Sequence, residues 1–141
     1  MTPDQVKLVQ QSFAKVVPIS EQAAVIFYDR LFEVAPAVRA MFPADMKEQR
    51  KTLMSILATV VSGLSDLPSI LPAASALATR HVAYGAKPEH YPVVGGALLW
   101  TMEKGLGAGW TPEIAEAWTA AYATLSGYMI SEAYGRPQAA E

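Results

Sequence analysis

The chain has 141 residues, 52% of them apolar and 17% charged, a composition that supplies one sizeable core and argues against intrinsic disorder. Its formal net charge is -2 and basic side chains form no cluster along the chain, which argues against a nucleic-acid partner. The absence of cysteine excludes disulfides, thiol catalysis and cysteine-bound metal centres.

No segment is expected to cross a membrane or to direct secretion. Residues 1–11 lack the basic region and continuous apolar stretch of a signal peptide. The longest apolar region, residues 53–64, is interrupted by serine, threonine and glycine, and it is shorter than the roughly 20 residues that a membrane-spanning helix needs. We therefore expect a soluble, cytoplasmic protein with no membrane span.

Helix signals begin at the N-terminus. Thr2 is a good capping residue, Pro3 would occupy the first helical position, and Gln5 follows the cap by three residues. Together they predict a helix that runs to about Val17 and stops before Pro18, because the residue before a proline disfavours helical geometry.

Three further helical segments are predicted before residue 65. One is expected to end near Pro36 and has apolar residues at helical spacing, namely Ala23, Phe27, Leu31 and Val34. Residues 37–42, between Pro36 and Pro43, have room for one short helix. A longer helix is expected from Gln49 to Leu64, with one broad apolar face formed by Leu53, Ile56, Leu57, Val60, Val61 and Leu64.

The second half of the chain continues the pattern. Pro68 and Pro72 are expected to open a helix that reaches to about Tyr84. A corner follows over residues 85–92, marked by a glycine and two prolines, and residues 93–106 have the pattern of another helix, which the glycines at 107 and 109 end.

The last predicted helix repeats the first start signal, with Thr111 as the cap and Pro112 at the first helical position. Its apolar residues continue at helical spacing through Ile114, Trp118, Tyr122, Leu125 and Met129. The sum is about seven helices and no strand. We therefore expect an all-α single domain over residues 1–141, with too many short helices for a plain four-helix bundle.

Candidates for chemistry are few, because the chain has only two histidines. His90, in the corner between Pro88 and Pro92, is expected to be solvated. His81 should point at the core, because it shares a predicted helix face with Ile70, Ala74, Leu77 and Tyr84. Two interpretations of His81 stay open: a buried histidine that bonds to a backbone carbonyl or hydroxyl, and the single protein ligand of a haem iron.

Several runs of residues, in order and at compatible spacing, carry a family resemblance: FYDRLF at 27–32, PAVR and MF within 36–42, RHVAYG at 80–85, HYPVVG at 90–95 and AWTAAY at 117–122. In these runs the chain resembles the globin family, above all the bacterial single-domain haemoglobins and the haem domains of flavohaemoglobins, and more distantly neuroglobin-like globins. The resemblance implies a globin fold around one haem pocket. A flavohaemoglobin carries a further reductase region, whereas this sequence ends at Glu141, so we expect the single-domain branch.

The resemblance also implies roles for individual residues. His81 corresponds to the proximal iron ligand and Phe42 to the phenylalanine that packs on the porphyrin. Tyr91 resembles a tyrosine that bonds to a glutamate of the last helix and helps to orient the proximal imidazole, and Glu132 is the candidate for that glutamate. The residues implied to contact haem b (iron protoporphyrin IX) are Phe42, Leu53, Leu57, Leu77, Arg80, His81, Val94 and Leu98. Those implied to face the bound gas are Tyr28, Gln49 and Leu53.

These roles predict reversible binding of O2, and of CO and NO, for storage, transport or delivery. Hydrogen bonds to a charged acceptor contribute roughly 1.5–3 kcal/mol each, so donors at Tyr28 and Gln49 should slow the release of O2 more than that of CO. Gln49 is a poor ligand for ferrous iron, so a five-coordinate ferrous state is expected. Two alternatives stay open: a nitric oxide dioxygenase that draws electrons from a separate, external reductase, and a sensory or haemless globin domain that acts through protein contacts.

Overall fold

The computed structural model describes residues 2–83, 87 and 89–134, and this part of the chain is helical without strands. Six α-helices lie within the described part: α1 (Pro3–Val16), α2 (Ser20–Val34), α3 (Lys47–Gly63), α4 (Leu67–Ala83), α5 (His90–Leu106) and α6 (Pro112–Tyr134). Three short 3-10 helices connect them: η1 (Val17–Ile19), η2 (Pro36–Met41) and η3 (Gly107–Gly109). The prediction of an all-α protein is confirmed. None of the helices described is long and apolar enough to cross a membrane.

Both predicted threonine caps are present. The backbone N–H of Gln5 donates to Thr2 Oγ1 at 3.1 Å, and Thr2 N–H donates back to Gln5 Oε1 at 3.0 Å, a reciprocal pair that satisfies two donors at the start of α1. At α6, Ile114 N–H donates to Thr111 Oγ1 at 3.2 Å. The local sequence thus determines where the first and last helices begin.

Several boundaries differ from the prediction, and α3, for instance, begins at Lys47 rather than Gln49. The short helix expected over residues 37–42 is the 3-10 helix η2, and α5 begins at His90, since Pro92 in its first turn needs no helical donor. Helix α4 begins at Leu67 and continues through Pro72, although this proline lacks the N–H for one helical hydrogen bond. Helix α4 continues because its buried face packs on α6. Ala74 and Ala78 of α4 form one buried cluster with Met129 of α6 and Tyr91 of α5. The predicted helix end at Tyr84 and most of the corner after it lie outside the described residues.

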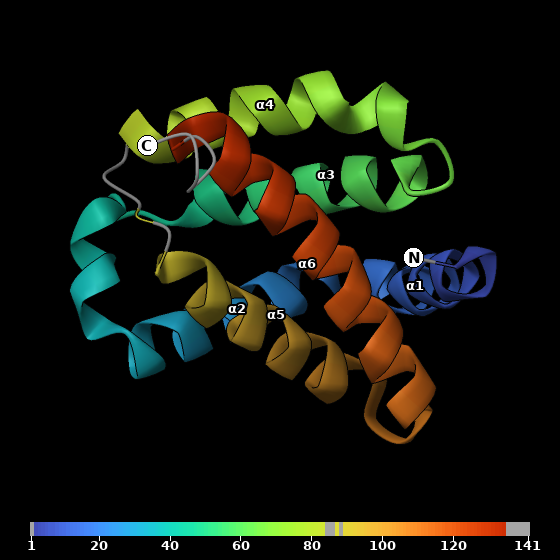
Figure 1. The fold of residues 1–141 in the computed structure, drawn as a ribbon. Coiled ribbons are helices and arrows are strands. Elements are labelled where there is room, and N and C mark those ends of the chain that lie inside the picture. The colour runs from blue at the N-terminus through green and yellow to red at the C-terminus, as the bar shows by residue number, and fades with distance from the viewer. Residues whose placement is uncertain (1, 84–86, 88, 135–141) are drawn as a thin grey trace.

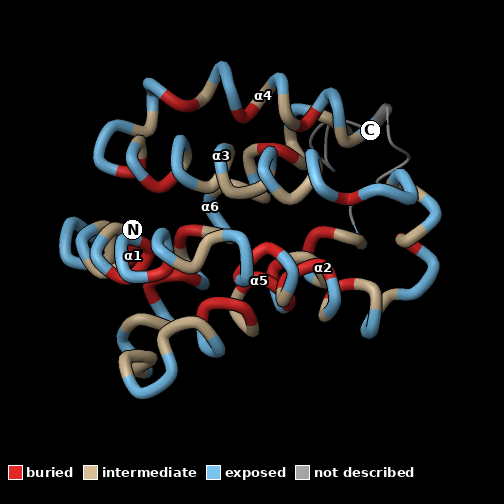
Figure 2. The backbone as a smooth tube through the Cα atoms, turned by 180° about the vertical axis from the view of Figure 1, so that it is seen from behind, coloured by how far each residue is buried: buried red, intermediate tan, exposed pale blue. Residues whose placement is uncertain are grey.

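The helices form two groups around a shared interior (Figure 1). Helices α2 and α5 pack along each other, α1 packs on α6, and α6 crosses α4, which lies beside α3. Figure 2 shows buried positions along the inner faces of α1, α2 and α5, whereas much of α3 is exposed or half-buried.

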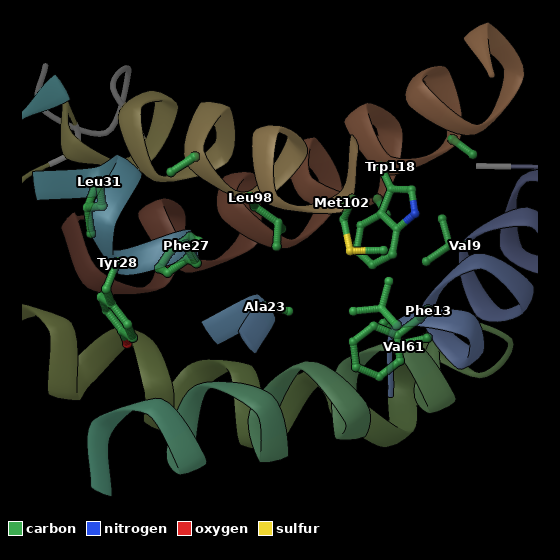
Figure 3. Packing of buried hydrophobic residues seen from close by; sticks show 14 of the residues in the cluster. Val9, Phe13, Ala23, Phe27, Tyr28, Leu31, Val61, Leu98, Met102 and Trp118 are labelled. Atoms are coloured by element: carbon green, nitrogen blue, oxygen red, sulfur yellow. The ribbon is translucent and has the colours of Figure 1, made fainter. Parts of the chain in front are cut away.

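At the α1 end the interior is filled by side chains. Phe13 and Trp118 pack with ring centroids 6.3 Å apart, beside Val61 and Met102 (Figure 3). The indole N–H of Trp118 donates to Ser12 Oγ at 2.8 Å, so the polar atoms of this buried pair are satisfied. Tyr28 lies at the opposite end of the cluster in Figure 3. This division leaves the other end of the molecule for a cavity.

Candidate functional site

A cavity of about 300 Å³ opens at the end of the molecule away from α1. Its wall comes from α2, the segment from η2 to Pro43, α3, α4, α5 and α6, and most of the lining is hydrocarbon. This volume lies at the lower end of the range for small-molecule sites, roughly 300–1,000 Å³. All residues predicted to contact haem or gas lie in this wall, namely Tyr28, Phe42, Gln49, Leu53, Leu57, Leu77, Arg80, His81, Val94 and Leu98.

His81 enters the cavity wall from the last turns of α4. Its Nδ1 lies 2.8 Å from the carbonyl oxygen of Leu77, and because a carbonyl only accepts, Nδ1 must carry the proton and donate. The lone pair then resides on Nε2, which is the arrangement that metal-binding histidines use. Burial lowers the pKa of His81, and the neighbouring Arg80 lowers it further, against the opposing effect of the Leu77 hydrogen bond. The ring is therefore neutral at neutral pH, as metal binding requires.

Tyr28 and Gln49 meet in the same wall from α2 and α3. Gln49 Nε2 donates to Tyr28 Oη at 3.1 Å, and the phenol retains its own proton to donate to a third group. Burial raises the pKa of Tyr28 above that of an ordinary tyrosine, although the bond from Gln49 opposes this shift. The phenol is therefore a neutral hydrogen-bond donor throughout the neutral pH range.

Phe42 belongs to an aromatic cluster that surrounds Tyr28. Its ring centroid lies 5.5 Å from that of Tyr28 and 5.4 Å from that of Phe32, both in edge-to-face geometry. The ring of Phe27 meets Tyr28 edge-on at 4.9 Å. Contacts of this kind favour one ring orientation, so the phenol and Phe42 hold each other in place.

The two residues predicted to support the proximal histidine have different placements. Tyr91 is buried in the cavity wall, with its ring centroid 6.1 Å from that of His81. Glu132 is exposed and does not line the cavity; its Oε1 accepts from Ser75 Oγ at 3.0 Å. The reason is the turn of α6, which directs Met129 into the cavity and Glu132 toward α4. Glu132 thus lies outside the wall that contains Tyr91, and its predicted role as the partner of Tyr91 stays a prediction.

His90 differs from the expectation of a solvated side chain. It is half-buried and lines the cavity, and its Nδ1 accepts from the N–H of Lys87 at 3.0 Å. The sequence did not indicate a cavity position for His90, because the prolines on either side of it predicted a solvated corner. Sequence reasoning also missed apolar residues of the wall, although Ile56, Leu125 and Met129 shared helical spacing with residues that it did select.

Comparison with known proteins identifies the family. The globin family model matches residues 25–129, more than half of the chain. The chain belongs to the globin family. This globin is 33% identical over 128 residues to a flavohemoprotein of Rhodopirellula baltica, a match that covers 89% of the globin and 31% of the relative. It is 34% identical over 107 residues to a flavohemoprotein of Bacillus subtilis, with 74% and 27% covered. The globin thus spans less than a third of the length of these curated relatives.

Solved structures confirm the predicted globin fold. A bacterial globin from Campylobacter jejuni superposes with a TM-score of 0.83 at 24% identity, over 94% of this globin and 96% of that chain. An engineered carbene transferase from Rhodothermus marinus superposes with a TM-score of 0.85 at 22% identity, over 94% and 93% of the two chains.

Proposed function

We propose that this globin holds haem b in its cavity, with His81 as the iron ligand, and reversibly binds O2 beside Tyr28. The observation that carries the proposal is that an imidazole and a phenol line one apolar cavity from separate helices, α4 and α2. Each ring is oriented by a hydrogen bond on one side, from His81 to Leu77 and from Gln49 to Tyr28.

The cavity wall suits a flat, largely apolar macrocycle. Leu53, Leu57 and Leu77 face the cavity but are only half-buried, so a hydrocarbon surface placed there would complete their burial. Arg80 is exposed and also lines the cavity, so it lies at the rim of the cavity. There its guanidinium group would pair with a carboxylate of the macrocycle. Because the chain has no cysteine, the macrocycle would be held without thioether bonds, which is the reason for proposing haem b.

Tyr28 and Gln49, on the side of the cavity that would receive the gas, would have different roles. When bound, haem supplies a ferrous iron that binds a diatomic gas and gives O2 partial negative charge. Tyr28 is the direct donor to that gas, because its phenol proton is not used in the bond from Gln49. Gln49 orients the phenol through its amide, and the surrounding hydrocarbon excludes water that would compete for the same proton.

The test of the proposal is a comparison of the two histidines. Wild type purified with haem should show a Soret band and a five-coordinate ferrous spectrum that changes on addition of O2. His81→Ala should lose the ferrous spectrum of an imidazole-bound haem, whereas His90→Ala should retain it, because the His81 ring has its proton on Nδ1 and a lone pair on Nε2, whereas Nδ1 of His90 is an acceptor. A wild-type protein without a Soret band would leave the haemless alternative, and an unchanged spectrum in His81→Ala would refute the proposed ligand.

Nitric oxide dioxygenation is a second candidate function. What favours it is the naming of both relatives as flavohemoproteins, which indicates a flavin as well as a haem in those proteins. In this globin the electrons would come from a separate reductase. The deciding measurement is catalytic consumption of nitric oxide with O2, NADH and a flavin reductase present. Consumption of many equivalents of nitric oxide per globin would establish this activity. Consumption of a single equivalent would favour gas binding.

A further inference from the structure

The corner between η2 and α3 holds part of the cavity wall without regular structure. Residues 42–46 form neither helix nor strand, yet the corner begins with Phe42 and leads into the helix that carries Gln49. Helix α3 has no side-chain cap at Met46. The position of Phe42 and Gln49 therefore depends on whatever fixes these five residues.

Arg39, on η2, bonds to this corner at three points. Its Nη1 donates to the carbonyl oxygen of Pro43 at 2.9 Å and to that of Phe42 at 3.3 Å. Its Nη2 donates to the carbonyl oxygen of Ala44 at 3.2 Å. One side chain thus satisfies three successive backbone acceptors that no helix or strand satisfies.

The same guanidinium group contacts the aromatic cluster. Its carbon lies 5.1 Å from the ring centroid of Phe32, and that ring meets Phe42 edge-on at 5.4 Å. Phe32 also lies 5.9 Å from Tyr28. Arg39 is therefore connected to both sides of the site, through the corner to Phe42 and through Phe32 to the phenol.

We propose that Arg39 is a positioning residue: it does not itself line the cavity, and it fixes the corner of residues 42–46, which supplies Phe42 and Pro43 to the cavity wall. The inference rests on the proposed function and adds to it a residue that acts through Phe42 and Tyr28 rather than on the gas. Its loss lets the corner move, which opens the cavity edge, speeds haem loss and loosens the distal geometry.

Arginine is needed because its planar group offers donors in a fixed fork, and two nitrogens of that fork reach different carbonyls here. A lysine retains the charge but presents a single nitrogen at the end of a flexible stem. The variant Arg39→Lys therefore tests the forked donor geometry alone. It keeps the positive charge, and with it any attraction between that charge and a carboxylate of the cofactor.

The experiment compares Arg39→Ala and Arg39→Lys with Arg30→Ala. Arg30 is a matched control, because it also lies over an aromatic ring, that of Trp100 at 4.0 Å, and pairs with Glu33, but contacts neither the corner nor the cavity. Three quantities are measured: haem transfer to excess apomyoglobin, the infrared C–O stretch of the ferrous CO complex, and hydrogen–deuterium exchange of residues 42–46 in the haem-free protein.

We expect Arg39→Ala to lose haem about tenfold faster than wild type, the factor that corresponds to one hydrogen bond from a charged donor. It should also broaden the C–O stretch and speed exchange at the corner, while Arg30→Ala matches wild type in all three. Arg39→Lys should resemble Arg39→Ala.

Two results overturn the inference while wild type still binds haem. One is an Arg39→Ala protein that matches Arg30→Ala in haem loss and corner exchange, and the other is full rescue by lysine. A wild-type protein that binds no haem would instead refute the proposed function, and this inference with it.

Discussion

Replacing Tyr28 by phenylalanine isolates one hydrogen bond. The ring keeps its contacts with Phe27 and Phe42, and only the hydroxyl that would donate to the gas is removed. A bond to a charged acceptor contributes about 1.5–3 kcal/mol, so O2 release should accelerate by about tenfold to a hundredfold. The lower end is expected, because the amide of Gln49 loses its acceptor in the variant and can turn to the gas instead.

Stopped-flow measurement of O2 and CO release provides the test. CO stays nearly apolar when bound, so its release should change by less than about threefold, which corresponds to a loss of well under 1 kcal/mol. Tyr128→Phe is the control, since its hydroxyl lies outside the cavity wall and interacts with Glu132. An O2 release rate in Tyr28→Phe equal to that of the control would refute the assignment of Tyr28 as the donor.

Three further predictions concern the same wall and its support. Gln49→Leu should accelerate O2 release by roughly twofold to tenfold, the range of a neutral hydrogen bond. In the double variant with Tyr28→Phe it should add at least as large a factor, because the amide is the donor that remains once the phenol is gone, as stopped-flow kinetics would show. Gly95→Ala should destabilise the fold by about 1–3 kcal/mol in urea unfolding, because the added Cβ would lie 2.6 Å from the Tyr122 ring; Gly96→Ala, with open space at the Cβ, should be neutral or stabilising. Burial raises the pKa of Tyr28 and Tyr122, so the folded state holds these protons more tightly than the unfolded state. The free energy of unfolding should therefore fall as the pH rises above about 10, where the tyrosines of the unfolded state lose their protons first, and a gain in stability there would contradict the shifts.

The sequence predicted most of the fold because its signals are local. Thr2 and Thr111 determine two helix starts through contacts three residues away, and neither needs the rest of the molecule. Pro72 shows the limit of this reasoning. A proline predicts a helix start or end by local rules, but α4 continues through it because the following turns pack on α6, a contact between segments far apart in the sequence.

Some residues of the candidate site could be predicted from the sequence and others could not. Spacing placed His81 on an inward face of its helix, and the family resemblance supplied Tyr28 and Gln49, all of which the structure brings to one cavity. Glu132 and His90 could not be placed reliably, because each depends on how a helix end turns relative to its neighbours. An offset of a single residue moves a helical side chain by about 100°, enough to exchange a cavity position for an exposed one.

The two sides of the site are supported by different helix pairs. Helix α4, with His81, packs chiefly on α6, whereas α2, with Tyr28, packs chiefly on α5, and α3 contacts both α2 and α4. The ring that would hold the iron and the hydroxyl that would hold the gas are therefore positioned by largely separate contacts. Because substitutions without shared partners have nearly additive effects, a change confined to the Tyr28 hydroxyl or the Gln49 amide should alter gas release while cofactor retention through His81 is preserved. This separation allows the affinity for a gas to change without rebuilding the pocket that holds the cofactor.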